Sequence, residues 1–206
     1  MSGQLQRVPG MQPPPNLSNF LSGLKSAGCT LLITGNLDPE TRAAVSRKLF
    51  GVTEGELNAD EPCRKRVLVQ TEQALNPHQY LPIDVEETSA MCSVLDATEA
   101  DRSTAAMDLA ADSIDTLDRS PATGLEEVAN TVERHVDDLF DTAVDPAPAE
   151  LRIGCSSLLS LEKRFAADDV EAFANSLASI ARGNRGMCHL HYPKADAAQL
   201  VRRLST

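Results

Sequence analysis

The sequence predicts a three-layer α/β fold, in which helices cover both faces of a doubly wound, mainly parallel sheet of about five strands. Short apolar runs alternate along the chain with longer segments of helical periodicity, which is typical of strands joined by helical crossovers. The runs are almost continuously apolar, as expected of strands buried on both faces. Hydrophobic residues make up 42% of the 206 residues and aromatic residues only 3%, so mainly aliphatic side chains must fill the core.

Five apolar runs are the predicted strands. They lie at residues 29–34, 66–70, 91–95, 151–155 and 187–192. The helix after the first run is well marked, because Asp38 can cap it, Pro39 suits its first turn and Gly51 ends it. Further helices are predicted over about 103–118, 124–142, 157–182 and 195–204.

The predicted helix over 124–142 is strongly amphipathic. Its apolar face comprises Leu125, Val128, Val132, Val136, Leu139 and Phe140. The opposite face carries Glu126, Glu127, Glu133, Asp137, Asp138 and Asp141. We interpret this acidic stretch as a solvated helix face and not as a docking surface.

One domain is expected, preceded by a tail. Residues 1–16 are polar and rich in proline, which predicts a disordered segment and excludes a signal peptide. Residues 17–206 form the predicted single α/β domain, opening with a helix in which Leu17, Phe20, Leu21 and Leu24 share a face. No apolar run approaches the roughly 18–20 residues that span a bilayer.

The charge composition argues against polyanionic partners. The formal net charge is -11, and a surface this acidic repels nucleic-acid phosphates and anionic membranes, so we expect neither partner. The longest basic run, Arg64–Arg66, is interpreted as flanking a strand. Lysine is scarce beside abundant Asp and Glu, which predicts a halophilic acidic surface of the haloarchaeal kind.

The five cysteines predict free thiols. They occur at positions 29, 63, 92, 155 and 188, without a CxxC pair and mostly within apolar runs. Free buried thiols in a reducing compartment explain this pattern best, so we expect a soluble, cytoplasmic protein. Redox chemistry is not expected, because neither Cys155 nor Cys188 has a resolving partner nearby in sequence.

Ligands of parallel α/β sheets bind beyond the carboxyl ends of the strands, which gives a set of candidate ligand-binding residues. These are Gly35, Asn36, Asp96, Ser156, Ser157 and His191. Arg42, Arg47 and Arg102 are the nearby cations that an anionic ligand could recruit.

The loop after the first strand stands where a P-loop would lie but lacks its residues. Phosphate binding there requires GxxxxGK[ST], in which backbone amides face the phosphate, Lys supplies charge and a hydroxyl binds magnesium. Residues 35–42 read GNLDPETR, with one glycine, no lysine and two carboxylates at the helix N-terminus, where they repel an anion. The fourth strand ends in Cys155 and Ser156, without the acid of a Walker B strand. Nucleotide binding, cofactors and ATP hydrolysis are therefore not expected.

Three segments carry a family resemblance. Residues 20–35 (FLSGLKSAGCTLLITG), 151–158 (LRIGCSSL) and 186–193 (GMCHLHYP) resemble strand-edge patterns of KaiC/RecA-type domains. Together they resemble a group of haloarchaeal proteins, called HTR-like, that keep the RecA-like core without its P-loop. The resemblance covers about residues 17–193 and implies a degenerate RecA-like fold with a regulatory or signalling role. It implies no catalytic residues.

Other site chemistries have weaker support. His189 and His191 lie two apart on a strand, so both point to one face, and Cys155 or Cys188 could complete a metal site. Asp96 could serve as a general base, although a loop and helix-start role explains it better. Residues 154–158 read GCSSL and lack the second glycine of a GxSxG nucleophile turn.

Two functions from different classes therefore remain open. The leading hypothesis is a non-catalytic regulatory or signalling module that acts through a protein partner or self-association. The alternative is a sensor of a small ligand, a nucleotide or another anion, bound at the strand ends without turnover. An enzyme built on His189, His191 and Asp96 is a third, weaker hypothesis.

Overall fold

The structure of the protein is a computed structural model. It describes residues 28–51, 63–73, 76–82, 91–98, 117–118, 124–141, 149–194, 197–198 and 200. The predicted tail (1–16), the predicted first helix (17–27) and most of the predicted last helix (195–204) lie outside the described residues. The same holds for Arg102, one of the candidate cations.

A six-stranded parallel sheet forms the middle layer of the described part of the chain. Its strand order is β1-β6-β5-β2-β3-β4. The strands are β1 (Cys29–Thr34), β6 (Met187–Tyr192), β5 (Ala149–Cys155), β2 (Cys63–Gln70), β3 (Cys92–Asp96) and the two-residue β4 (Leu117–Asp118). The predicted mainly parallel sheet is confirmed, with five longer strands and the short β4 at one edge.

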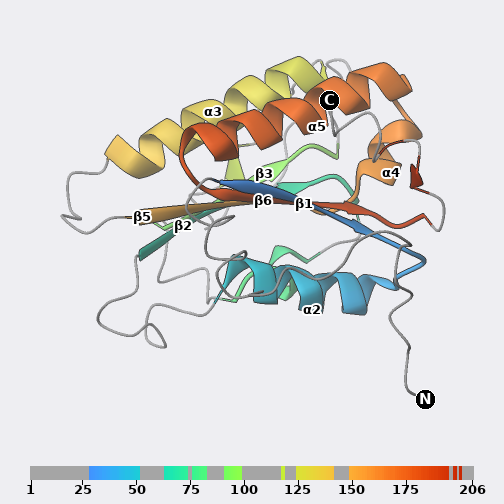
Figure 1. Cartoon of the computed structure of the whole chain (residues 1–206), viewed down its shortest axis with the longest axis horizontal. Helices are drawn as coiled ribbons and strands as arrows, with labels where there is room; N and C mark the ends of the chain where they lie inside the picture. The colour runs from blue at the N-terminus through green and yellow to red at the C-terminus, as the bar shows by residue number, and fades with distance from the viewer. Residues whose placement is uncertain are drawn as a thin grey trace, which may run out of the picture.

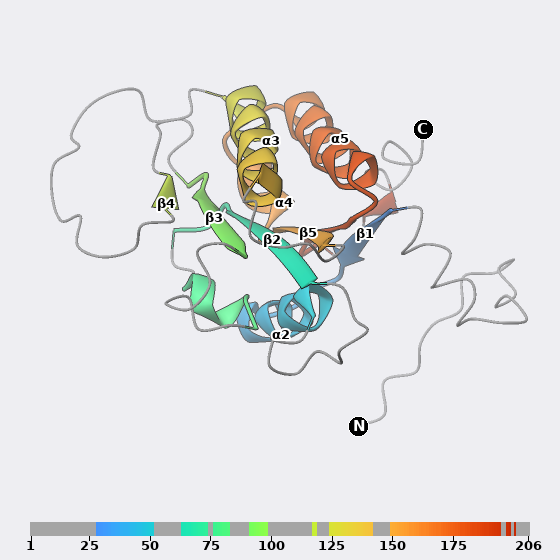
Figure 2. The same cartoon turned by 90° about the vertical axis from the view of Figure 1, so that its left-hand side faces the viewer.

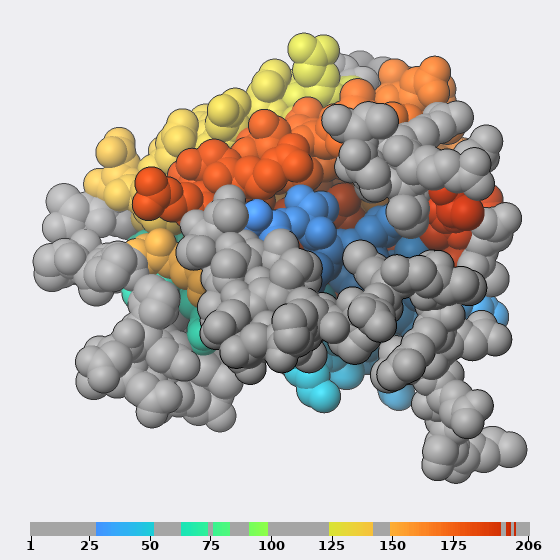
Figure 3. All heavy atoms as spheres, in the orientation of Figure 1, coloured from blue at the N-terminus to red at the C-terminus, as the bar shows by residue number. Residues whose placement is uncertain are grey.

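Helices cover both faces of this sheet (Figure 1). On one face lie α3 (Leu125–Asp141), α5 (Ala167–Gly183) and the short α4 (Leu158–Glu162), which follows β5 and precedes α5 in the chain. On the other face lie α2 (Pro39–Phe50) and the 3₁₀ turn η2 (Pro77–Gln79) (Figure 2). The space-filling view shows α3 and α5 side by side, with α2 on the opposite side of the molecule (Figure 3).

The order of the strands explains this division of the helices. The chain crosses the sheet in one direction from β1 to β2, β3 and β4, and returns in the other direction to β5 and β6. Right-handed crossovers in opposite directions place their helices on opposite faces. The direction reverses between β5 and β2, which therefore form the switch point where α/β proteins bind ligands.

Most predicted elements are confirmed, with two changes of boundary. The strand predicted at 66–70 begins at Cys63, because Cys63 and Arg64 pair with Ala149 and Glu150 of β5. The basic run Arg64–Arg66 was predicted to flank this strand, and that interpretation is wrong, since all three residues lie within β2. The strand tolerates Arg66 in its fully buried position because its guanidinium donates to the carbonyls of Phe50 and Arg64.

Residues 117–118 correct the helix predicted over 103–118. Leu117 and Asp118 form β4 and pair with Val94 and Leu95 of β3. The backbone N–H and C=O groups on the open side of β3 need hydrogen-bond partners, and residues 117–118 supply them. Helical periodicity in the sequence does not report this pairing. Residues 103–116 lie outside the described part of the chain.

The predicted long amphipathic helix is confirmed as α3, except for Phe140. The other five predicted apolar residues of α3 are buried, and the six acidic residues are exposed. Phe140 is 41% exposed. It follows Leu139, which takes the last buried position, and one residue of helix turns a side chain by about 100° toward solvent.

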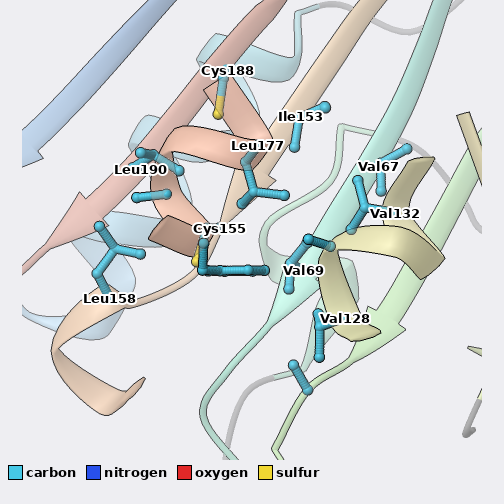
Figure 4. Packing of buried hydrophobic residues seen from close by; sticks show 14 of the residues in the cluster. Val67, Val69, Val128, Val132, Ile153, Cys155, Leu158, Leu177, Cys188 and Leu190 are labelled. Carbon is cyan, nitrogen blue, oxygen red and sulfur yellow. The ribbon is translucent and has the colours of Figure 1, made fainter. Parts of the chain in front are cut away.

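The main core lies between the sheet and the α3/α5 layer (Figure 4). Alternate strand residues such as Val67, Ile153 and Leu190 point into it and pack against Val132 and Leu177 of the helices. No helix in the described residues has both the length and the apolar character needed to cross a membrane.

Candidate functional site

Most of the buried polar strand residues in the described part of the chain lie on the α2 side of the sheet. Residues that alternate with the main-core positions point toward α2, and many of them are polar and buried. They are Arg66, Gln70, Arg152, His189 and His191 from the strands and Arg42 and Ser46 from α2. Two hydrogen-bonded groups lie within this polar layer, one at the switch point and one beneath the middle of α2.

The switch point between β2 and β5 is closed by hydrogen bonds of the chain itself. The backbone amide of Thr71, just after β2, donates to Oγ of Ser156, just after β5, at 2.9 Å. The Thr71 hydroxyl contacts the same Oγ at 3.0 Å and donates to the Ser157 carbonyl at 2.7 Å. The Ser156 amide donates to the Val69 carbonyl, so both strand ends are tied together.

Arg42 seals the α2 side of the same switch point. Its Nη1 lies 2.8 Å from Oε2 of Glu72 and donates to the Ser156 carbonyl at 3.1 Å. The other carboxylate oxygen of Glu72 accepts from Ser160 Oγ at 3.0 Å, which links α2 to α4. Arg42 is 5% exposed, so its charge faces this internal pair and not solvent.

The second group lies beneath the middle of α2. Ser46 Oγ is 3.1 Å from Nε2 of His189 and 2.9 Å from Nε2 of His191. All three residues are fully buried. Within the described residues, Nδ1 of each histidine has no hydrogen-bond partner.

The surroundings of the histidines favour their neutral forms. Burial lowers the pKa of His189 well below its usual range, and the neighbouring His191 and Arg152 lower it further. Burial, with a contribution from Arg42, lowers the pKa of His191 to about 4. Phe50 packs edge-on against His189 with ring centroids 4.6 Å apart.

Gly154 makes room for this histidine packing. A Cβ at this position would lie 2.5 Å from Cζ of Phe50 and 2.6 Å from Cε1 and Nε2 of His189. Gly154 pairs with His189 across the two strands, so the ring of His189 and the phenyl ring of Phe50 occupy the space over its missing side chain. The glycine in the apolar run 151–155 thus has a packing reason.

The loop after β1 is closed to anions by the chain's own cap. Asp38 accepts from the Thr41 amide at 2.9 Å and from the Thr41 hydroxyl at 2.7 Å, and these bonds lower the pKa of its carboxyl group. Pro39 follows at the first helical position and has no amide hydrogen. The N-terminus of α2 therefore presents a carboxylate where a phosphate would bind.

The six residues predicted to bind a ligand do not form one open site. Gly35 and Asn36 follow β1, while Ser156 and Ser157 are buried in the closed switch point. Asp96, at the end of β3, accepts from the Thr98 amide, as expected of a turn residue. His191 lies under α2 with Ser46 and is fully buried, because that helix covers the inward-facing residues of β6.

The suggested metal and thiol chemistries lose their geometric basis. Cys155 and Cys188 point into the main core, on the opposite face of the sheet from His189 and His191, so they cannot complete a metal site with them. Among the described residues, no group of three or more His, Cys, Asp or Glu side chains could hold a metal. Burial raises the pKa of Cys155 to about 12 and that of Cys188 well above its usual range, which disfavours reactive thiolates.

Several residues of this side of the protein were not among the predicted site residues, and Ser46 and Tyr80 are examples. Ser46 comes from a helix face and Tyr80 from a loop, and only the tertiary structure brings them to the strands. A signal for Ser46 was present in the sequence, because Arg42, Ser46 and Phe50 share one face of α2 at helical spacing. That face is half polar, so hydrophobic periodicity did not identify it.

Comparison with known families places the chain in one of them. Residues 28–206 match the model of a family of unknown function, DUF7504, so the chain belongs to that family. No curated protein is similar enough to this chain to match it.

Proposed function

We propose that this member of the DUF7504 family is a non-catalytic regulatory or signalling module with a degenerate RecA/KaiC-like fold, acting through a protein partner or self-association. The observation that carries the proposal is the closed switch point. In α/β proteins this crevice receives the ligand, whereas here Thr71, Ser156 and the Arg42–Glu72 pair fill it with mutual hydrogen bonds. A fold that has filled its own ligand crevice keeps its outer surface for binding.

The loop residues support the same proposal. A nucleotide triphosphate needs donor amides and a cation at the helix N-terminus, and this protein places Asp38 and Pro39 there. The Arg42 guanidinium, one turn further on, is committed to Glu72. Both features oppose phosphate binding, and the parallel sheet with helices on both faces is compatible with a RecA-like ancestry.

Calorimetry of the full chain with ATP and ADP tests the nucleotide part of the proposal. The titrations use magnesium and molar potassium chloride, which suits the acidic surface expected of a cytoplasmic halophilic protein. We expect no binding heat for either nucleotide. Micromolar binding would show that the 35–42 loop works as a phosphate site and would replace the proposal with a nucleotide-driven switch.

The interaction part of the proposal needs a separate experiment. Light scattering of the purified chain over a concentration series reports self-association, and affinity capture from a lysate of the source organism at high salt reports a partner. We expect at least one of the two to be positive. A strictly monomeric protein that recovers no specific partner would contradict the proposal.

A small-ligand sensor is the second candidate, and Arg42 is the observation that favours it. Of the three predicted cations, Arg42 lies at the switch point, and Glu72 can be displaced by a competing anion because 24% of its side chain is exposed. A thermal-shift screen of nucleotides, nucleosides and cyclic dinucleotides would reveal stabilisation that grows with ligand concentration. The Glu72→Gln variant, which frees Arg42, should bind an anionic ligand more tightly. A flat screen with both proteins would eliminate the sensor.

A further inference from the structure

The Ser46–His189–His191 group holds a fixed number of protons. Ser46 has one hydroxyl proton and lies within hydrogen-bond distance of two Nε2 atoms. Both bonds form when Ser46 donates to one Nε2 and the other Nε2–H donates to Ser46 Oγ. Two neutral imidazoles of opposite tautomer satisfy this arrangement, and the histidine that accepts from Ser46 must stay neutral for both bonds to persist.

The tautomers can be assigned from the two distances to Ser46, since an O–H donor makes shorter hydrogen bonds than an N–H donor. Arg152 acts on His189 and Arg42 acts on His191, so the surrounding cations do not distinguish the two rings. His189 then donates from Nε2 to Ser46, and Ser46 donates to Nε2 of His191 over the shorter distance of 2.9 Å. His191 carries its proton on Nδ1, which has no acceptor among the described residues.

Additional protons have no favourable place in this group. A first extra proton would occupy Nδ1 of His189, where no described acceptor is available. A second would create two cations with ring centroids 5.8 Å apart and would leave the Ser46 proton without an acceptor. The cations that act on the pair are Arg42 from α2 and Arg152 from β5, and both repel a histidinium. Their carboxylate partners, Glu72 for Arg42 and Glu150 for Arg152, are bonded to the guanidinium groups.

The remaining neighbours of the two histidines supply no negative charge that would stabilise a protonated imidazole. Phe50 of α2 packs on His189, and Tyr80, next to η2, packs edge-on toward His191 with ring centroids 6.5 Å apart. The Tyr80 hydroxyl is buried and burial raises its pKa, so it stays neutral. Leu31 and Ile33 of β1, which pair with the two histidines, are apolar.

The contacts of α2 make it the element that protonation would displace. Its buried residues are Arg42, Ala43, Ser46 and Phe50, so half of its inward face is polar. The apolar cluster beneath it has seven members, namely Ala43, Phe50, Leu68, Tyr80, Leu81, Cys92 and Val94. Moving α2 away is the direct way to hydrate both imidazoles, because α2 covers them.

We propose that Ser46, His189 and His191 form a proton-operated latch, which holds α2 on the sheet at neutral pH and releases it when the two histidines become protonated. This function is additional to the interaction role proposed above and does not depend on it. Release of α2 would uncover the polar side of the sheet while the α3/α5 side stays packed.

The direction and steepness of the pH dependence follow from the histidines. Their folded-state pKa values lie below the ordinary value of 6.5, so the open state binds more protons once the pH falls below 6.5. The closed state is therefore most stable relative to the open state above pH 6.5. This stability decreases as the pH falls toward the folded-state pKa values of the histidines. Each histidine raises the opening equilibrium constant by up to about tenfold per pH unit, and the pair by up to about 100-fold.

Hydrogen exchange of the full chain between pH 7 and pH 5, corrected for intrinsic exchange rates, tests the latch. We expect protection of amides in residues 39–50 to fall by roughly 50-fold between pH 6 and pH 5, because the open-state histidines are already partly protonated at pH 6. Amides of residues 167–183 should remain better protected than those of α2 at every pH. Equal protection of α2 and α5 at every pH would overturn the proposal, because α2 would then leave only by global unfolding.

Variants separate the latch from general acid sensitivity. His191→Gln should reduce the dependence to about tenfold per pH unit, and Ser46→Ala should raise opening at pH 7 while keeping the two-proton slope. His135→Gln is the matched control, since His135 bonds to Ser93 outside the latch and its loss should leave the α2 slope unchanged. An α2 slope in His191→Gln as steep as in the parent protein would also overturn the proposal.

Discussion

The two faces of the sheet are built from the same strands but stabilised in different ways. Toward α3 and α5, the strands present aliphatic side chains that join one large apolar cluster. Toward α2, the same strands present arginines, histidines and Gln70, and the apolar cluster has only seven members. Apolar packing depends on the area buried and is insensitive to pH, whereas a buried polar layer depends on every hydrogen bond being made. The apolar face therefore contributes most of the stability, whereas the polar face depends on individual hydrogen bonds.

The largest expected effect lies on the apolar face. Leu177 of α5 is fully buried in the main cluster, so Leu177→Ala should lower the free energy of unfolding by about 2–5 kcal/mol. Urea titration followed by circular dichroism measures the change. Phe140→Ala is the control, because that side chain is exposed and should change stability by less than about 0.5 kcal/mol. Similar losses in both variants would show that the α3/α5 layer is not the main source of stability.

The Arg42–Glu72 pair tests how far the polar face depends on its partners. Arg42→Met leaves the partly buried Glu72 carboxylate with Ser160 but without a countercharge, so we expect a loss of about 2 kcal/mol, below that of a fully buried pair. Adding Glu72→Gln removes the uncompensated charge and should restore part of the stability. The same urea titrations measure both variants. A double variant as unstable as Arg42→Met would mean that packing and not charge explains the loss.

Gly154 tests the close packing of the histidine. Gly154→Ala forces a Cβ against Phe50 and His189, so we expect a loss of about 1–3 kcal/mol in chemical denaturation. Gly183, at the end of α5, has open space around its missing Cβ. Gly183→Ala should therefore be neutral or slightly stabilising. Equal effects of the two substitutions would contradict the tight contact beneath α2.

The smallest effect of the series is expected at the N-terminus of α2. Asp38→Ala removes the acceptor of the Thr41 amide and should speed hydrogen exchange in the first turn of α2 without changing that of α5. Asp38→Asn keeps an acceptor and should change it less. Because the folded-state pKa of Asp38 is lowered, its contribution is present above the ordinary value of 3.8 and fades as the pH falls through the folded value. Unchanged exchange in Asp38→Ala would show that the cap is dispensable.

The sequence predicted the apolar side of this protein better than the polar side. The strand positions, the amphipathic helix α3 and the well-capped helix α2 follow from periodicity and end signals that lie within a few residues of one another. Phe140 was predicted to be buried but is exposed, because the last turn of α3 buries Leu139 and turns Phe140 toward solvent. The β4 strand departed because pairing at a sheet edge depends on a neighbour elsewhere in the chain.

The candidate site could be predicted only in part. The i and i+2 spacing of His189 and His191 correctly placed both on one face of a strand. The face of the sheet on which the histidines lie, and the helix that covers it, depend on the direction of each crossover between strands. These crossovers place Ser46 against the histidines, and they place Cys155 and Cys188 on the opposite face of the sheet.

The sequence by itself determined the fold class, the missing phosphate-binding residues and the acidic charge of this protein, because these depend on local patterns and composition. Only the tertiary structure decided that the switch point is closed and that two histidines contact one hydroxyl group. The physical reason is that hydrogen bonds between Thr71 and Ser156, or between Ser46 and His191, join residues 85 and 145 positions apart. Such contacts exist only once the strand order and the helix positions are fixed.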